Sequence, residues 1–147
     1  DDAHLGLDDY LHMGIFDALA AVAKIVPGEA VHAVGYCLGG LLAFLTATRT
    51  DSDASVSYYG VGLENRVGEA DKLARPLMLH IAEEDSFVPK PAQERIVSAL
   101  KNHPQITIHA YPGRNHAFAR PGGENYDAQD AAAANARTAE FFKANLK

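Results

Sequence analysis

The sequence contains a single cysteine, Cys37, and no tryptophan. One cysteine permits no internal disulfide, and it excludes a metal site built from several thiolates. No apolar run approaches the roughly 18 residues that cross a bilayer, and the acidic, polar start of the chain has no signal-peptide pattern. These absences predict a cytoplasmic protein, since thiols stay reduced in that compartment.

Basic residues are also scarce, because 13 Lys and Arg stand against 19 Asp and Glu and the net charge is −6. Nucleic-acid-binding proteins usually present a basic face, so we expect neither nucleic acid nor membrane as a partner. With 147 residues, 48% of them hydrophobic and 22% charged, the chain has the size and composition of one globular domain. A single domain over residues 1–147 is therefore expected.

Hydrophobic spacing predicts helices that alternate with short apolar strands. A helix is expected from Asp8 or Asp9 to Val26, closed by Pro27 and Gly28. A valine-rich, buried strand at residues 30–36 follows, then strands at 54–59, 77–82 and 106–111 and helices at 38–48, 93–102 and 127–146. The polar connection at 64–73 is either helical or irregular. Four strands separated by helices predict an α/β fold with about four parallel strands and helices on both faces.

Three reactive side chains follow three of these strands. Cys37 comes after the first, Asp85 after the third and His116 after the fourth. Ligand sites of parallel α/β sheets gather at the carboxyl ends of the strands, so we expect these side chains to lie close together. The order nucleophile, acid, histidine is that of α/β-hydrolases and differs from the chymotrypsin and subtilisin orders.

Cys37 lies in the segment Gly-Tyr-Cys-Leu-Gly-Gly at residues 35–40, which has the G-x-C-x-G form of a nucleophile elbow. Such a turn strains the backbone at the nucleophile, and side chains at Gly35 and Gly39 are expected to collide with it. The start of the next helix favours a thiolate, and the backbone N–H of Leu38 is the expected oxyanion donor. The alternative interpretation is a buried structural cysteine. A dinucleotide or Walker A loop is excluded by the residues present.

His116 is the histidine placed in a Gly- and Pro-rich loop after the last predicted strand, whereas His32, His80 and His109 fall inside strands, where core histidines are expected. No two histidines have the spacing of a metal-binding helix, so we expect no metal, and no motif calls for another cofactor. His116 is therefore the candidate base.

Asp85 is the candidate for the carboxylate that fixes the histidine tautomer. Glu83 and Glu84 are rivals, and an acid after a strand can also be a helix cap or a solvated loop residue. With a thiol, an imidazole and a carboxylate in place, the expected chemistry is acyl transfer on Cys37.

Together these motifs resemble the dienelactone hydrolase family over almost the whole chain. The segments that carry the resemblance are residues 35–40, 58–63, 84–89 and 116–120. It implies an α/β-hydrolase fold and hydrolysis of the lactone ring of dienelactone to maleylacetate. It also implies that Arg120 binds the substrate carboxylate while Tyr59, Phe87 and Tyr36 line the pocket. The alternatives are a solvated loop arginine and ordinary core aromatics.

Family members also carry a substantial amino-terminal portion, with the sheet's first strands, the second oxyanion donor, a glutamate that contacts the cysteine and another arginine. This chain starts at about the helix that follows them, so we expect an amino-terminally shortened domain that cleaves small esters or lactones. The alternative is a catalytically weak or inactive partial hydrolase that assembles with itself or a partner chain. The strand at 30–36 would then lack a neighbour, which predicts homo-oligomers through its open edge. A redox or acyl-carrier module is a third hypothesis, but no resolving cysteine is present.

Overall fold

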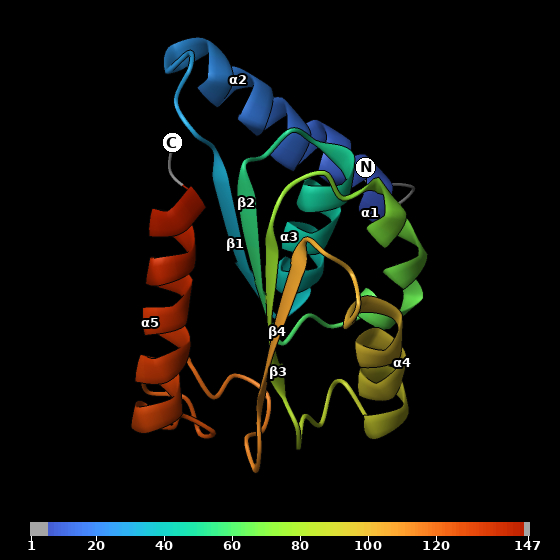
Figure 1. The fold of residues 1–147 in the computed structure, drawn as a ribbon, viewed down its shortest axis with the longest axis vertical. Helices are drawn as coiled ribbons and strands as arrows, with labels where there is room; N and C mark the ends of the chain where they lie inside the picture. The colour runs from blue at the N-terminus through green and yellow to red at the C-terminus, as the bar shows by residue number, and fades with distance from the viewer. Residues whose placement is uncertain (1–5, 146–147) are drawn as a thin grey trace.

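The computed structural model describes residues 6–145 and is built around one parallel β-sheet (Figure 1). Its strands are β1 (His32–Tyr36), β2 (Ala54–Tyr58), β3 (Leu77–Ala82) and β4 (Ile106–Tyr111). They lie in the order β1-β2-β3-β4, and each neighbouring pair is parallel. The predicted α/β fold with four parallel strands is confirmed, and all four strands end at the same edge of the sheet.

Helices cover both faces of the sheet, as predicted (Figure 1). They are α3 (Leu38–Arg49) and α4 (Lys90–Leu100) on one face, and α5 (Ala128–Asn145) on the other. The two layers follow from the alternation of side chains along a strand. In β3, Leu77 and Leu79 belong to the core under α3 and α4, whereas Met78 and Ala82 belong to the core under α5.

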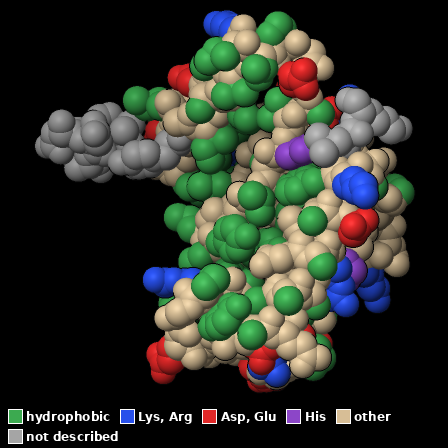
Figure 2. All heavy atoms as spheres, turned by 90° about the vertical axis from the view of Figure 1, so that its left-hand side faces the viewer, with side chains coloured by type: hydrophobic (Ala, Val, Ile, Leu, Met, Phe, Trp, Pro, Cys, Tyr) green, Lys and Arg blue, Asp and Glu red, His purple; other side chains and the backbone are tan. Residues whose placement is uncertain are grey.

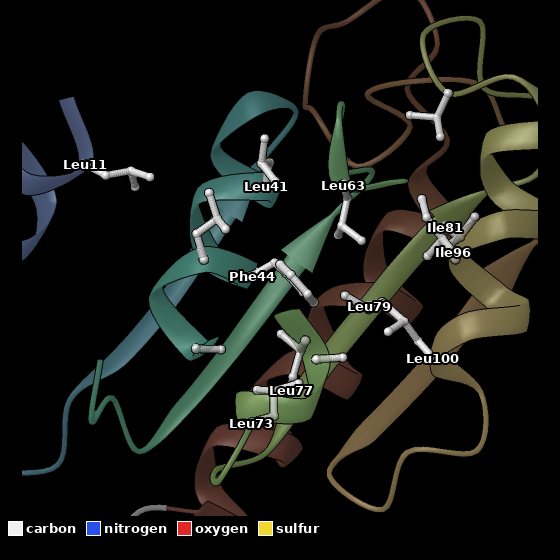
Figure 3. Packing of buried hydrophobic residues seen from close by; sticks show 14 residues of the cluster. Leu11, Leu41, Phe44, Leu63, Leu73, Leu77, Leu79, Ile81, Ile96 and Leu100 are labelled. Atoms are coloured by element: carbon white, nitrogen blue, oxygen red, sulfur yellow. The ribbon is translucent and has the colours of Figure 1, made fainter. Parts of the chain in front are cut away.

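The larger core lies between the sheet and the α3–α4 layer (Figure 3). Phe44 and Leu45 of α3, Leu77 of β3 and Leu100 of α4 have no exposed surface. Burying a side chain of this size contributes about 1.5–3 kcal/mol. These contacts hold α3 against the sheet, and with it the turn at its amino-terminal end.

The helical segments after β2 differ in detail from the predicted ranges. The polar connection after β2 forms two 3₁₀ segments, η2 (Leu63–Asn65) and η3 (Val67–Lys72). Helix α4 begins at Lys90 rather than residue 93, because Pro89 caps it and Pro91 is tolerated in a first turn whose N–H groups have no helical acceptor. Helix α5 ends at Asn145, and the predicted final residue 146 lies outside the described part of the chain.

The amino-terminal helix differs most from the prediction. It is divided into α1 (Leu7–Tyr10), a π-helical segment η1 (Leu11–Phe16) and α2 (Asp17–Ile25). Neither Asp8 nor Asp9 is the cap, because Gly6 takes that position and its N–H donates to the Asp9 carboxylate at 2.8 Å. No residue of α2 is buried, since this helix extends past the sheet (Figure 1).

Strand β1 is an edge strand within residues 6–145, where it pairs only with β2. It begins at His32 rather than residue 30, because the N–H of Val31 donates to the carboxylate of Asp53 at 2.8 Å. The valine-rich pattern predicts a buried strand, but Val34 is 49% exposed and Tyr36 is 46% exposed. Among the helices that the structure describes, none is long and apolar enough to span a bilayer.

Candidate active site

The turn between β1 and α3 holds Cys37 in an unusual backbone conformation. Its φ of 59° and ψ of −122° lie in a region that non-glycine residues avoid, at a cost of about 1–3 kcal/mol. Three hydrogen bonds hold it there. The Cys37 N–H donates to Tyr58 O at 3.1 Å, and the Cys37 carbonyl accepts from Gly40 N at 2.9 Å and Val61 N at 3.2 Å. The turn therefore presents the thiol at the carboxyl end of the sheet.

The glycines around this turn confirm one sterically required position and correct another. A Cβ at Gly35 would collide with the backbone carbonyl of Gly39. A Cβ at Gly39 would meet nothing within 4 Å, so the prediction that a side chain there would collide is wrong. The second crowded position is Gly40, whose Cβ would lie 2.7 Å from Tyr58 O. It needs glycine because the turn packs directly on β2.

Asp85 and His116 form a buried pair at the same edge of the sheet. The Nδ1 of His116 lies 3.0 Å from Oδ1 and 2.9 Å from Oδ2 of Asp85. Asp85 is 5% exposed and His116 is 7% exposed. Oδ1 of Asp85 also accepts the N–H groups of Phe87 at 2.8 Å and Val88 at 3.1 Å, which orient the carboxylate. The pair leaves Nε2 of His116 as the ring nitrogen available for chemistry.

The rival acids have other partners. Glu84 forms an ion pair with Lys90 at 3.2 Å. Glu83 contacts the neighbouring strand through its backbone, where its N–H donates to Tyr111 O at 3.1 Å. Of the three acids in this loop, Asp85 is the one that reaches the imidazole.

Two asparagines that the sequence analysis missed hold the His116 loop in place. Oδ1 of Asn115 accepts the N–H of Ser86 at 2.9 Å and that of His116 at 2.6 Å, so it joins the loops that follow β3 and β4. Nδ2 of Asn125 donates to His116 O at 3.0 Å. An asparagine directly before a loop histidine was the available signal, since asparagine side chains commonly bond to nearby backbone.

A cavity of about 670 Å³ opens at this edge and joins the predicted residues. Cys37 and His116 both line it, and no hydrogen bond joins the thiol to the ring within the described residues. The remaining predicted pocket residues, Tyr36, Tyr59, Phe87 and Arg120, line the same cavity. Asp85 lies behind His116. The N–H of Leu38, the first residue of α3, has no acceptor within the helix.

Aromatic rings enclose the imidazole. The ring centroids of Tyr59 and Phe87 lie 4.9 Å and 4.7 Å from that of His116. Burial raises the pKa of Tyr59, so its hydroxyl stays protonated at neutral pH. Phe87 is exposed and forms part of the cavity's rim. The surroundings of the ring are thus largely apolar, which strengthens electrostatic interactions there.

Apart from His116, the cavity wall carries one cationic side chain, Arg120, and one anionic side chain, Glu124. Arg120 belongs to none of the ion pairs found within residues 6–145. Its guanidinium is therefore available to an anionic ligand. No group of three or more His, Cys, Asp or Glu residues in this part of the chain has the geometry of a metal site.

Known proteins resemble this chain over most of its length. The model of the dienelactone hydrolase family matches residues 8–146. A protein of Azospirillum brasilense, provisionally named carboxymethylenebutenolidase, is 51% identical over 123 residues, which cover 84% of this chain and 52% of its own. The carboxymethylenebutenolidase of Pseudomonas putida is 40% identical over 109 residues, covering 74% and 46%. The chain thus spans about half the length of these relatives.

A solved structure agrees with this assignment. A provisionally assigned dienelactone hydrolase of Klebsiella pneumoniae superposes with a TM-score of 0.76 at 25% identity, over 88% of this chain and 59% of that one. The sheet, the layers and the strained turn after β1 are those of an α/β-hydrolase. This chain belongs to the dienelactone hydrolase family.

Proposed function

We propose that this chain carries the catalytic residues of a hydrolase for small carboxylic esters or lactones, with Cys37 as nucleophile, His116 as base and Asp85 as the residue that orients the base. One observation carries the proposal: the buried Asp85–His116 pair borders the cavity into which the strained Cys37 turn opens. Strain of this kind persists only where the surrounding structure enforces it, and it clusters at active sites.

The proposed reaction proceeds through an acyl-enzyme. Nε2 of His116 takes the thiol proton, and the sulfur of Cys37 forms a bond to the carbonyl carbon of the ester. The N–H of Leu38 donates to the oxyanion. The carbon–oxygen bond of the ester then breaks, and His116 returns the proton to the departing alkoxide. Water, deprotonated by His116, attacks the thioester, releases the acid and restores the thiol.

The cavity favours a substrate that carries a carboxylate. Arg120 offers a guanidinium that forms no ion pair within residues 6–145, and Tyr36, Tyr59 and Phe87 supply apolar walls. Guanidinium groups bind carboxylates through two parallel hydrogen bonds. The relatives are named for a lactone that bears a carboxyl group, which agrees with this chemistry. Because the proposed nucleophile is a free thiol, a reducing compartment such as the cytoplasm suits the mechanism.

We also propose that β1 mediates self-association. Its outer edge has unpaired backbone groups within residues 6–145, and the side chain of Val34 on this strand is exposed. Exposed Val22 and Ile25 of α2 add apolar surface, and hydrophobic side chains spread over the face shown in Figure 2. An open apolar edge readily pairs with another chain.

Turnover of 4-nitrophenyl acetate tests the catalytic proposal. We expect wild-type activity to fall to background in Cys37→Ala and in His116→Ala. His12→Ala is the matched control, since this exposed histidine lies on η1, away from the cavity lining. Activity that persists in both active-site variants would refute the mechanism.

A further inference from the structure

A row of aromatic and imidazole rings crosses the α5 face near the carboxyl ends of the strands. The register aligns Tyr36 with Tyr58, Tyr58 with His80 and His80 with His109. Successive ring centroids lie 4.5, 4.2 and 5.7 Å apart. The row starts at the cavity, since Tyr36 lines it, and runs under α5. The catalytic proposal makes no use of its polar atoms.

A chain of hydrogen bonds connects the centre of this row to α5. His80 is 1% exposed, and both of its ring nitrogens have partners. Its Nδ1 lies 2.8 Å from the hydroxyl of Tyr111, and its Nε2 lies 3.0 Å from Oγ1 of Thr138. Thr138 Oγ1 lies 2.7 Å from the hydroxyl of Tyr58. Three hydroxyls and one imidazole therefore form one continuous path.

Both ends of the path are residues of α5. At one end, Nη1 of Arg137 donates to the hydroxyl of Tyr111 at 3.0 Å. At the other end, the hydroxyl of Tyr58 donates to Oδ1 of Asn135 at 3.0 Å. A guanidinium only donates and an amide oxygen only accepts, so the two ends define a direction.

This direction assigns every hydrogen in the path. Tyr58 gives its one hydrogen to Asn135, so Thr138 must donate to Tyr58, and Nε2 of His80 must donate to Thr138. Nδ1 of His80 then accepts from Tyr111. The ring is neutral in this arrangement, which agrees with burial lowering the pKa of His80 to about 3.

The opposite orientation of the Asn135 amide fits poorly. If Nδ2 donated to Tyr58, the hydrogens would run the other way, and His80 and Arg137 would both donate to the Tyr111 oxygen. The hydrogen of Tyr111, a residue that is 2% exposed, would then have no acceptor in the path. A buried hydroxyl without an acceptor is costly. The path therefore holds the Asn135 carbonyl toward Tyr58.

Asn135 also lines the cavity that contains Cys37 and Arg120. With its carbonyl accepting from Tyr58, the Nδ2 hydrogens are the donors that Asn135 can offer to a ligand in the cavity, and rotating the amide would reverse the path. Arg120 and Glu124 together give the cavity wall no net formal charge. A hydrogen-bond donor with a fixed direction would therefore help the cavity to select an anionic substrate. Resting on the function proposed above, we infer that Asn135 Nδ2 donates to the carboxylate held by Arg120 and sets the preference for acidic esters.

The preference is measured with two esters of equal chain length, neutral 4-nitrophenyl hexanoate and anionic mono-4-nitrophenyl adipate. Asn135→Asp keeps an oxygen for Tyr58, and therefore the path, but it removes the donor and adds a negative charge. We expect it to lower the adipate-to-hexanoate ratio of kcat/KM at least about tenfold, mainly through KM, as the loss of a hydrogen bond to a charged group predicts.

Asn145→Asp is the matched control, because it adds the same charge to α5 about 15 Å further along the helix, at 1.5 Å per residue. Its ratio should stay within about twofold of wild type, since charges separated by more than a Debye length of about 8–10 Å are largely screened. An unchanged ratio in Asn135→Asp, with wild type hydrolysing both esters, would overturn the role of Asn135 and leave the hydrolase proposal intact.

Binding supplies a readout that does not depend on turnover. We expect 3-phenylpropionate, but not 3-phenylpropanamide, to shift the side-chain amide signals of Asn135 in ¹⁵N-correlated NMR spectra, and to bind Asn135→Asp at least about tenfold more weakly. If this holds while neither ester is hydrolysed, the carboxylate site stands and the hydrolase proposal fails. If 3-phenylpropionate leaves these signals unmoved, the role of Asn135 is rejected.

Discussion

The imidazole of His116 and the carboxylate of Asp85 share one short contact, with Nδ1 placed 2.9 Å from Oδ2 in a buried setting. This contact assigns the proton-bearing nitrogen, because a carboxylate can only accept. In the neutral tautomer that this contact selects, the other ring nitrogen of His116, Nε2, can act as a base.

Asp85→Asn should lower kcat/KM for 4-nitrophenyl acetate by about 10³-fold or more, the scale expected when the histidine is held in the wrong tautomer. The new amide would donate to Nδ1 of His116, so the proton of the neutral ring would lie on Nε2. Nε2 could then no longer accept the proton of the Cys37 thiol. Glu84→Gln is the control, since this acid is exposed and paired with Lys90. A loss of less than about threefold in Asp85→Asn would contradict the proposed role.

Asn115→Ala should reduce kcat more than it raises KM, by about tenfold, because a small displacement of a positioned base costs rate. Without its Oδ1, the N–H groups of Ser86 and His116 lose a shared acceptor, and the two loops are no longer joined. Asn145→Ala, on α5, controls for loss of an asparagine. Equal kinetics in both variants, measured with 4-nitrophenyl acetate, would show that Asn115 does not position His116.

Gly35→Ala should destabilise the protein far more than Gly39→Ala in urea unfolding. A Cβ at Gly35 collides with the Gly39 carbonyl, and a backbone clash has no rotamer that relieves it. We expect a loss of about 3 kcal/mol or more, since overpacking against fixed atoms is the costly case. Gly39→Ala should change the free energy of unfolding by less than about 1 kcal/mol, because its Cβ is free and alanine favours a helix.

Acid should destabilise the fold through His80. Its pKa is about 3 when folded, because burial opposes the charge, against 6.5 for an exposed ring. Between these values the unfolded chain binds one more proton than the folded one. The free energy of unfolding therefore falls with acid by up to about 1.4 kcal/mol per pH unit.

His80→Gln tests this dependence, because it removes the titrating group. Its stability should fall less steeply than that of wild type between pH 6.5 and 3. Burial also lowers the pKa of His109, which adds a slope of the same sign to both proteins. Parallel curves of unfolding free energy against pH would show that His80 does not titrate as described.

Val34→Lys should shift the protein toward a monomer in light scattering, because a charge on an edge strand opposes pairing with another chain. Val34 is exposed on β1, so the substitution removes little buried surface. Thr107→Lys, an exposed position on the opposite edge strand β4, is the matched control and should leave the mass unchanged. A wild-type monomer at all concentrations would refute self-association.

Local patterns made much of the site predictable. The elbow at residues 35–40 is one continuous segment whose glycines reflect steric demands within a few residues, and Gly35 meets that expectation. Gly39 does not, because the crowding comes from β2, which packs on Gly40. A motif shows that a turn is tight, but which of its residues has no room for a side chain depends on the strand that packs against the turn.

Contacts between segments that are distant in sequence account for the structural features that the sequence patterns did not predict. Asn135 reaches Tyr58 only because α5 packs across β2, and His80 is neutral because two hydroxyls and the helix enclose it. Helix α2 carries the apolar spacing of a buried helix, yet none of its residues is buried within residues 6–145. Periodicity reports which side chains favour burial, and the arrangement of neighbours decides whether they are buried.

The sequence by itself determined the parallel α/β fold and the placement of Cys37, Asp85 and His116 at strand ends, since both follow from hydrophobic period and chain order. Only the tertiary structure decided which carboxylate meets the imidazole, which asparagines hold it and which way the buried hydrogens run. These depend on distances of about 3 Å between loops and helices that packing alone brings together.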